Sequence, residues 1–122
     1  MTRGETLVDR VRAALKDVPR VEERRMFGGT AFLVRGKFCV SAREERILCR
    51  IDPATHDAAI QRKGCSTLVM KGRPYRGYVR VDADAVRTAR GLESWIAMAL
   101  RYNERAKASS RKWSRTESIR KR

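Results

Sequence analysis

The apolar and polar positions of the first hundred residues follow two different periods. Between residues 7 and 18, apolar side chains recur at three- and four-residue spacing and form one stripe, which predicts an amphipathic helix. Two polar pairs are placed to cap its first turn, Thr2 with Glu5 or Thr6 with Asp9. Pro19 ends the predicted helix, because a proline disfavours helical geometry in the residue before it.

After residue 20 the period changes to two, which is the period of a strand with one buried face. The alternation predicts strands over residues 22–27, 32–34, 38–40 and 47–51. Gly28-Gly29 permits a bend between the first two strands, and Arg35-Gly36 forms a tight turn before the third. These residues are therefore predicted to form an antiparallel meander.

The same alternation assigns faces to two of the three cysteines. Cys49 shares its parity with Ile47, whereas Cys39 has the opposite parity to Phe38 and Val40. Because successive strand residues point to opposite faces, we expect Cys39 and Cys49 to lie on different sides of the sheet. An odd number of cysteines in a chain expected in the cytoplasm indicates free thiols.

A short middle helix is predicted next. Asp52 is suited to the N-cap and Pro53 to the first helical position. The helix is expected to reach about Arg62, and Gly64 closes it with left-handed geometry.

Two further strands and a long helix complete the pattern. The strands are predicted over residues 67–70 and 77–81, joined by a turn at residues 71–74. Asp82 or Asp84 is expected to cap the last helix. Its broad apolar face comprises Val86, Ala89, Leu92, Trp95, Ile96, Ala99 and Leu100.

The order of elements predicts an α+β fold: an antiparallel sheet of five or six strands with an N-terminal helix, a short middle helix and a long C-terminal helix. At 122 residues the chain is long enough for one hydrophobic core. We assign residues 1–106 to this domain and residues 107–122 to a basic tail. No apolar run is long enough to span a membrane, and the N-terminus lacks a secretory signal, so we expect a cytoplasmic protein.

Charge separates the tail from the domain. The formal net charge is +15. Residues 101–122 contain nine Lys or Arg residues against two acids, so their charge density far exceeds that of the preceding hundred residues. Such a balance favours contact with polyanions.

No constellation of catalytic, metal-binding or cofactor-binding residues is visible, and we predict none. The cysteines are widely spaced and His56 is the only histidine, so the ligands of a structural zinc site are lacking. Neighbouring helix positions do not face each other, which excludes a His56–Asp57 dyad and indicates an exposed or capping histidine. Gly28-Gly29 lies between strands and not at a helix N-terminus, so it does not fit a phosphate-binding loop.

Lys and Arg residues are interleaved with aromatic residues in the last predicted hairpin and in the tail. Such sets bind phosphates and stack on bases, although a solvated hairpin face gives the same pattern. The candidate nucleic-acid contacts are Lys71, Arg73, Tyr75, Arg76, Arg111, Lys112, Trp113, Arg115, Arg120, Lys121 and Arg122.

Several segments together resemble a known family. They are residues 25–29 (Arg-Met-Phe-Gly-Gly), residues 31–38, residues 71–74 with Tyr78, and the last helix around Leu92, Trp95 and Leu100. Over about residues 5–105 the chain resembles the N-terminal domain of the TfoX/Sxy family. The resemblance implies an antiparallel sheet with helices packed on it. Founding members are regulators of natural competence that carry a second, C-terminal domain, so the chain resembles a stand-alone version of the first domain.

Two classes of function remain. The first is a non-enzymatic regulatory or accessory module that associates with nucleic acid without sequence specificity. The second is a protein–protein interaction module, either a homodimer or a binder of another protein, including an acidic one. The first class of function predicts that the Lys and Arg side chains of the tail and hairpin converge on one face of the molecule. The second class predicts an exposed apolar patch instead.

Overall fold

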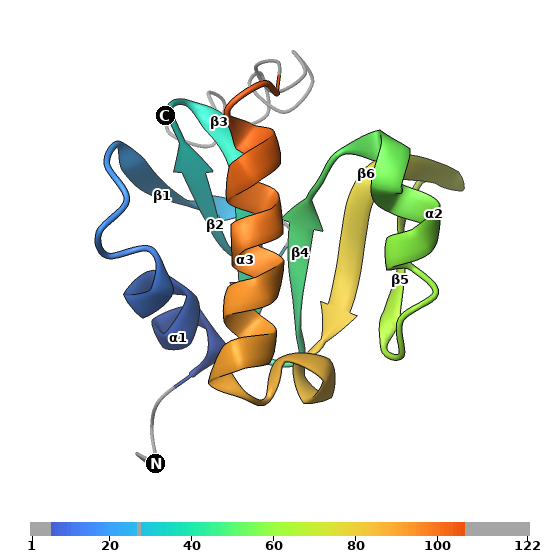
Figure 1. The fold of residues 1–122 in the computed structure, drawn as a ribbon, viewed down its shortest axis with the longest axis horizontal. Helices are drawn as coiled ribbons and strands as arrows, with labels where there is room; N and C mark the ends of the chain where they lie inside the picture. The colour runs from blue at the N-terminus through green and yellow to red at the C-terminus, as the bar shows by residue number, and fades with distance from the viewer. Residues whose placement is uncertain (1–5, 27, 107–122) are drawn as a thin grey trace.

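The computed structural model describes residues 6–26 and 28–106. Its elements, in chain order, are α1 (Leu7–Ala14), β1 (Val21–Met26), β2 (Gly29–Val34), β3 (Lys37–Arg43), β4 (Arg46–Arg50), the 3-10 turn η1 (Pro53–Thr55), α2 (His56–Ala59), β5 (Cys65–Met70), β6 (Arg73–Asp82), the 3-10 turn η2 (Ala83–Val86) and α3 (Ala89–Asn103). Figure 1 shows their arrangement. The predicted α+β class and order of elements are confirmed.

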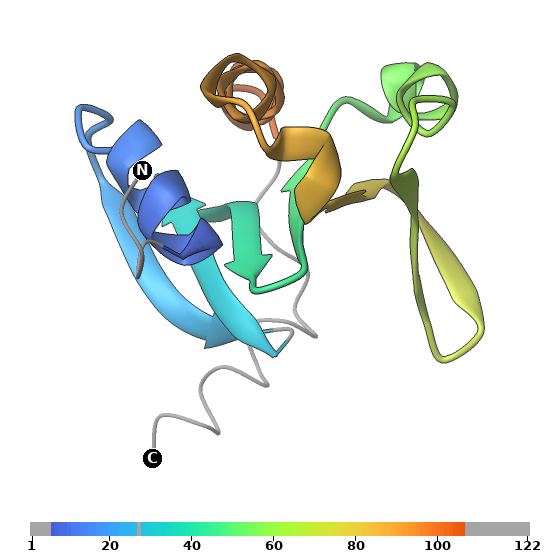
Figure 2. The same cartoon turned by 90° about the horizontal axis from the view of Figure 1, so that it is seen from below.

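Within the described residues, six strands form one sheet in the order β1-β2-β3-β4-β6-β5, and every neighbouring pair is antiparallel. The helices lie on one face: α3 packs over β3 and β4, α1 over β3, and α2 against β6 (Figures 1 and 2). No helix of the described residues is long and apolar enough to cross a membrane.

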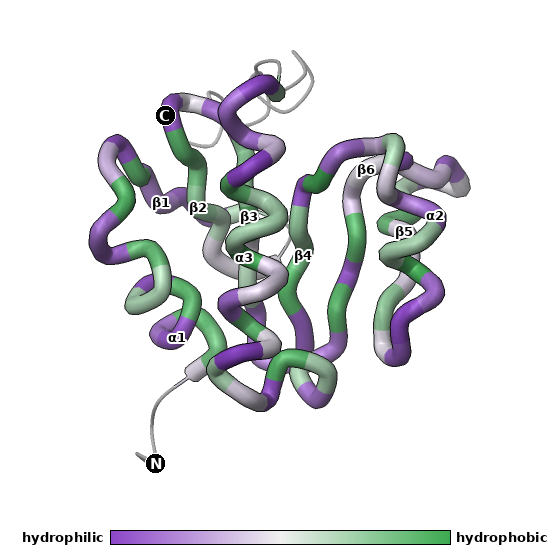
Figure 3. The backbone as a smooth tube through the Cα atoms, viewed as in Figure 1, coloured by the Kyte–Doolittle hydropathy of each residue, from purple (hydrophilic) through white to green (hydrophobic). Residues whose placement is uncertain are grey.

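The main core lies between the sheet and the helices. A row of directly paired residues crosses the sheet on this side, from Phe32 through Val40, Cys49 and Val79 to Thr67. Leu92, Trp95, Ile96 and Ala99 of α3 cover it. The edge strand β1 is largely hydrophilic, whereas β4 is hydrophobic through its middle (Figure 3). A charged edge discourages pairing with a further strand.

Local capping confirms two expectations and corrects a third. Thr6 and Asp9 form the capping box of α1, and Asp52 accepts a hydrogen bond from the Ala54 N–H at the start of η1. The predicted cap of the last helix at Asp82 or Asp84 is wrong. Residues 83–86 form η2 first, and Thr88 caps α3 by accepting from the Gly91 N–H at 3.0 Å.

The first and last predicted boundaries also shift. α1 ends at Ala14, ahead of Pro19, and hydrogen-bonded turns connect it to β1. β5 begins at Cys65 and β6 at Arg73, so the connecting turn shrinks to Lys71-Gly72. Both turn residues have positive φ, 52° and 76°, which gives the tight reversal of a two-residue hairpin.

A bulge in β3 overturns the expected placement of the cysteines. Phe32 of β2 pairs with Val40, but the next residue, Leu33, pairs with Phe38. Cys39 is the extra residue, and the parity of the strand changes there. Phe38 therefore faces away from the helices, while Cys39 joins Val40 and Cys49 in the helix-covered core. The two thiols share one face of the sheet.

A larger irregularity separates the end of the β5–β6 hairpin from the sheet. Thr67 pairs with Val79, whereas its neighbour Leu68 pairs with Tyr75, so three residues of β6 lie between the two registers. Gly77, at φ 92°, is among them. The outer part of the hairpin, residues 68–75, projects away from the helix layer (Figure 2). We call this part the arm.

Candidate nucleic-acid interface

The sheet has a second face, which none of the described helices covers (Figure 2). We call it the open face. A separate apolar cluster lies on it, comprising Met26, Ala31, Leu33, Phe38, Leu48 and Leu68, with Met70, Tyr75 and Tyr78 packed against it. The arm therefore contributes to the open face, and the two sides of the sheet carry separate apolar clusters.

Three arginines gather at one end of the open face. Arg43 pairs directly with Arg46 across β3 and β4. Arg80 of β6 pairs with Leu48 of β4. Leu48 is two residues from Arg46 on the same strand, so Leu48 and Arg46 point to the same face of the sheet. Directly paired residues of antiparallel strands share a face. We call Arg43, Arg46 and Arg80 the arginine group.

Positive charge in this group is only partly compensated. Burial is the main cause that lowers the pKa of Arg46, and the charges of Arg80 and Arg43 lower it further, while those of Glu45 and Asp82, the residue directly paired with Arg46, act in the opposite direction. Arg43 lies 3.4 Å from Glu45. Within the described part of the chain, neither Arg46 nor Arg80 forms an ion pair. Like charges held together in this way favour an anion that neutralises them.

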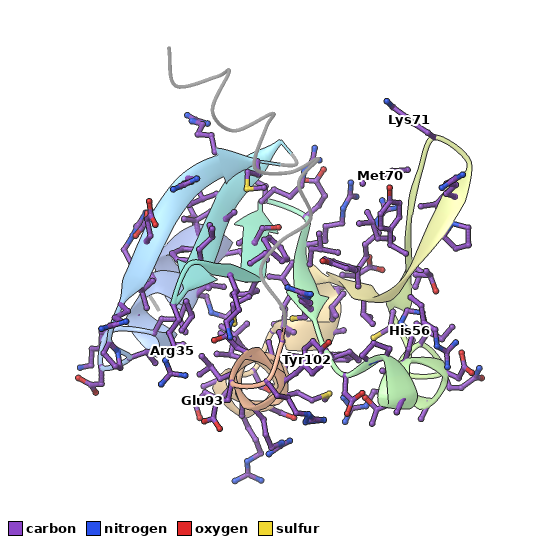
Figure 4. All side chains as sticks on the ribbon, turned by 90° about the horizontal axis from the view of Figure 1, so that it is seen from above. Arg35, His56, Met70, Lys71, Glu93 and Tyr102 are labelled. Carbon is purple, nitrogen blue, oxygen red and sulfur yellow. The ribbon has the colours of Figure 1, made fainter. Side chains whose placement is uncertain are left out.

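A hollow of about 240 Å³ adjoins the arginine group. Strands β3, β4 and β6 form its floor, and the arm forms one wall. Its lining combines the three arginines with apolar side chains and one hydroxyl: Ser41, Arg43, Arg46, Ile47, Leu48, Leu68, Val69, Met70 and Arg80. Ser41 is 5% exposed, and Met70 lies on the inner side of the arm (Figure 4).

The predicted hairpin contacts do not all reach this face. Lys71 lies at the tip of the arm (Figure 4). Arg73 pairs with Met70, and Tyr75 pairs with Leu68, so both belong to the arm beside the hollow. Arg76 turns to α2 and forms a two-pronged ion pair with Asp57, at 3.0 and 3.2 Å. The basic side chains of the protein hairpin therefore lie on two different sides of the molecule.

Aromatic contacts continue the open face beyond the hollow. The ring of Tyr75 meets that of Tyr78 edge-on at 6.1 Å, and the ring of Tyr78 lies 6.0 Å from that of Phe38. The guanidinium of Arg50 lies 5.6 Å from the Tyr78 ring. This combination of cations and aromatic rings is typical of surfaces that contact single-stranded nucleic acid.

Seven predicted contacts lie outside the described residues. They are Arg111, Lys112, Trp113, Arg115, Arg120, Lys121 and Arg122. They stay predictions.

The interpretation of His56 as exposed or capping is wrong. Its side chain is 3% exposed and lies between α2 and the base of the arm (Figure 4). Nδ1 accepts a hydrogen bond from the Gly77 N–H at 2.9 Å, so Nε2 carries the proton and donates to the Thr67 hydroxyl at 2.8 Å. Burial, and next the charge of Arg76, lower the His56 pKa. The ring joins α2 to the irregular segment of β6.

The cysteines are free in the described structure. Burial raises the pKa of Cys39 to about 12, and burial also raises that of Cys49 well above its ordinary value, with Cys39 and Cys65 adding to the effect. Burial also raises the pKa of Cys65. Neutral thiols are poor nucleophiles and poor metal ligands. Cys39 and Cys49 lie in the core, and Cys65 packs against it. Within the described residues, no group of three or more His, Cys, Asp or Glu side chains is placed to bind a metal.

Sequence reasoning missed Arg43 and Arg46 and did not commit to Arg80. The available signal was parity: Arg46 alternates with buried Ile47 and so shares the face of Leu48. Parity alone could not bring Arg46 near Arg80, because β4 and β6 are not consecutive in the chain and become neighbours only through the strand order.

Comparison with known proteins supports one assignment. The family model described as the TfoX N-terminal domain matches residues 13–102, which is well over half of the 122-residue chain. Searches of curated proteins and of solved structures each found no match. The matched range includes every strand of the sheet, the whole arginine group and all of α3 except its last residue. The chain belongs to the TfoX N-terminal domain family.

Proposed function

We propose that this protein is a non-enzymatic, competence-regulator-like accessory module that associates with nucleic acid without sequence specificity. Membership of the TfoX N-terminal domain family supports the regulatory part of the proposal. The observation that carries the nucleic-acid part is the arginine group, in which three positive side chains gather beside a hollow on the open face.

The electrostatics favour a polyanion as the partner. Bringing phosphates to Arg46 and Arg80 offsets the repulsion among the arginines, which adds to burial in lowering the Arg46 pKa. The whole chain carries a net charge of +15, so attraction acts over the surface as well as at the group. Arginine contacts to phosphates fix position but carry no base information, and the binding should therefore be insensitive to sequence.

The test measures binding of the full chain to two labelled DNA duplexes of unrelated sequence and to one RNA. If about five phosphates are neutralised, raising salt from about 50 to 200 mM should weaken binding roughly 500-fold. The two duplex sequences should bind equally. A chain of residues 1–106 measures the contribution of the tail by the same titration.

The arginine group is tested by replacing Arg46 and Arg80 together with Gln. Each lost phosphate contact should reduce the salt slope by about 0.9. The matched control is Arg76→Gln, because Arg76 is held by Asp57 on another part of the surface. Absence of binding by the full chain at low salt would refute the proposal. An unchanged slope in the double variant would remove the arginine group from it.

A second candidate function is supported by a different observation. Val69 on the arm is 50% exposed, and among the described residues it is the one large apolar side chain classed as exposed. We propose protein–protein association through the arm as the alternative. Sedimentation of the wild type and Val69→Lys tests homodimer formation. A pull-down with and without nuclease separates a protein partner from a nucleic acid.

A further inference from the structure

We infer that the hollow accepts one unstacked base, so that the nucleic acid bound by this protein is single-stranded. The inference rests on the proposed function, because it identifies the substrate class of the same surface. It is carried by three observations together: the size of the hollow, the apolar side chains in its lining, and the three arginines that line it beside them.

The hollow has room for a small group. Its volume is about 240 Å³. A duplex is a rod far wider than such a space, and its bases are stacked inside, so a duplex can contact the rim but cannot fill the hollow. A single strand has unpaired bases that can turn out of the stack.

The chemistry of the lining matches a base with its phosphate. Leu48, Leu68 and Met70 present apolar atoms to one another across the floor and wall. The faces of a base are apolar and pack on such surfaces, and guanidinium planes also stack on bases. Ser41 is buried within the lining and has a hydroxyl that can donate to or accept from a base edge.

The combination of arginines and apolar side chains favours a nucleotide over an acidic peptide. Arg43, Arg46 and Arg80 would attract either polyanion. An acidic peptide, however, would carry its charged carboxylates toward Leu48, Leu68 and Met70, where burial of a charge without a partner is unfavourable. A nucleotide places its charge on the phosphate and its apolar surface on the base. A lining that places arginines beside apolar side chains therefore favours the nucleotide.

The arm gives the site its selectivity. Leu68, Val69 and Met70 belong to the arm, and the irregular register near Gly77 separates them from the flat part of the sheet. Without this projection the arginine group would lie on an open sheet, where it would bind the phosphates of single-stranded and double-stranded nucleic acid alike. Met70 is partly buried, so its truncation removes part of the wall without emptying the main core.

The experiment uses the full chain and two labelled probes, an oligothymidine of about twelve nucleotides and a duplex of similar length. Wild type should bind the single strand more tightly. Met70→Ala should weaken single-strand binding about tenfold, the size expected for loss of one base contact, and should leave duplex binding unchanged. Val69→Ala should give a smaller loss in the same direction.

The matched control is Met98→Ala, which truncates a partly buried methionine on α3, away from the open face. It should change neither affinity. Circular dichroism verifies that each variant is folded. A strand with 2-aminopurine at one position provides a direct readout, because its fluorescence should rise when the base leaves the stack and should rise less with Met70→Ala.

Three results would overturn the inference, and they differ from failure of the proposed function. Equal loss of single-strand and duplex binding in Met70→Ala would show that the arm only supports the rim. No loss of either would show that the hollow holds no base, while the proposed polyanion binding stands. Displacement of the single strand by polyglutamate at equal charge, with the same sensitivity to Met70→Ala, would assign the hollow to an acidic peptide. Binding of neither probe would refute both proposals.

Discussion

The two faces of this sheet are built from the same strands but differ in the residues that they carry and in their burial. On the helix-covered face, Phe32, Val40, Cys49 and Val79 lie in one row and are fully buried. On the open face, the neighbouring row runs from Ala31 through Ser41 and Leu48 to Arg80. The four residues of the first row are apolar, whereas the second row contains a hydroxyl at Ser41 and a charge at Arg80.

The difference separates the residues that stabilise the fold from those to which we assign the proposed binding. Residues under α1 and α3 lose water on folding and stabilise the chain by about 25 cal/mol per Å² of apolar area buried. The arginine group gives no such gain, because the charges of Arg43 and Arg80 act against that of Arg46, with Glu45 and Asp82 compensating in part. Substitutions on the covered face should therefore change folding, whereas substitutions in the arginine group should change binding.

The largest expected effect is on the covered face. Phe32→Ala removes a fully buried ring from the centre of the core and should lower the free energy of unfolding by about 4 kcal/mol. Denaturant unfolding measures it. The control is Val69→Ala on the arm, where half of the side chain is exposed and the loss should stay under about 0.5 kcal/mol. Comparable losses in both variants would break the comparison.

A polar exception within the covered face gives the next effect. Asn103 lies on the buried stripe of α3, is 2% exposed, and neither of its side-chain amide atoms has a hydrogen-bond partner in the described structure. Asn103→Leu should raise the free energy of unfolding by about 2 kcal/mol, because an unsatisfied buried amide is removed. Thermal unfolding checks this. The paired variant Asn103→Asp buries a charge and should destabilise, and a loss of stability in Asn103→Leu would contradict the assignment.

His56 should make stability depend on pH. The folded state holds the neutral ring, since Nδ1 accepts from Gly77, and its pKa lies below the ordinary value of 6.5. The unfolded chain takes up the proton first, so stability should fall as pH is lowered through about 6.5. The nearby charges are Arg76, which opposes protonation, and Asp57, which favours it.

The loss should reach about 1 kcal/mol between about pH 7.5 and 5.5, the size of one hydrogen bond. Urea unfolding at each pH measures it. His56→Gln can still accept from Gly77 but does not titrate, so its stability should be flat over this range. His56 is the only histidine of the chain, which makes the comparison direct. Stability that rises on acidification would contradict the hydrogen-bond assignment.

The smallest expected effect is the most specific to the open face. Arg80→Gln relieves repulsion on Arg46 and should raise the free energy of unfolding by roughly 0.3 kcal/mol at low salt. The gain should disappear at about 1 M salt, where the Debye length is about 3 Å. The same variant should bind nucleic acid more weakly. Loss of both stability and binding would show instead that Arg80 is a structural residue.

Local pattern determined much of this fold. The switch from a period of about 3.6 to a period of two, and back, located the first and last helices and the strands, and Asp52-Pro53 located the short middle helix. Thr6 with Asp9 and Asp52 with Pro53 were identified as starts because capping depends on residues three positions apart or fewer. Residues 25–38 and 71–78 also carried the resemblance to the family that the chain belongs to. Each of these signals is contained within a short stretch of sequence.

Only the tertiary structure decided which residues meet. One extra residue at Cys39 reverses the parity of β3 and brings two thiols to one face, and the sequence has no marker for it. His56 is buried because the irregular segment of β6 places Gly77 against it. Arg46 and Arg80 become neighbours because β6 inserts beside β4. Alternation assigns a side to each residue within its own strand, whereas contacts between strands depend on order and register, which are set by packing of the whole sheet.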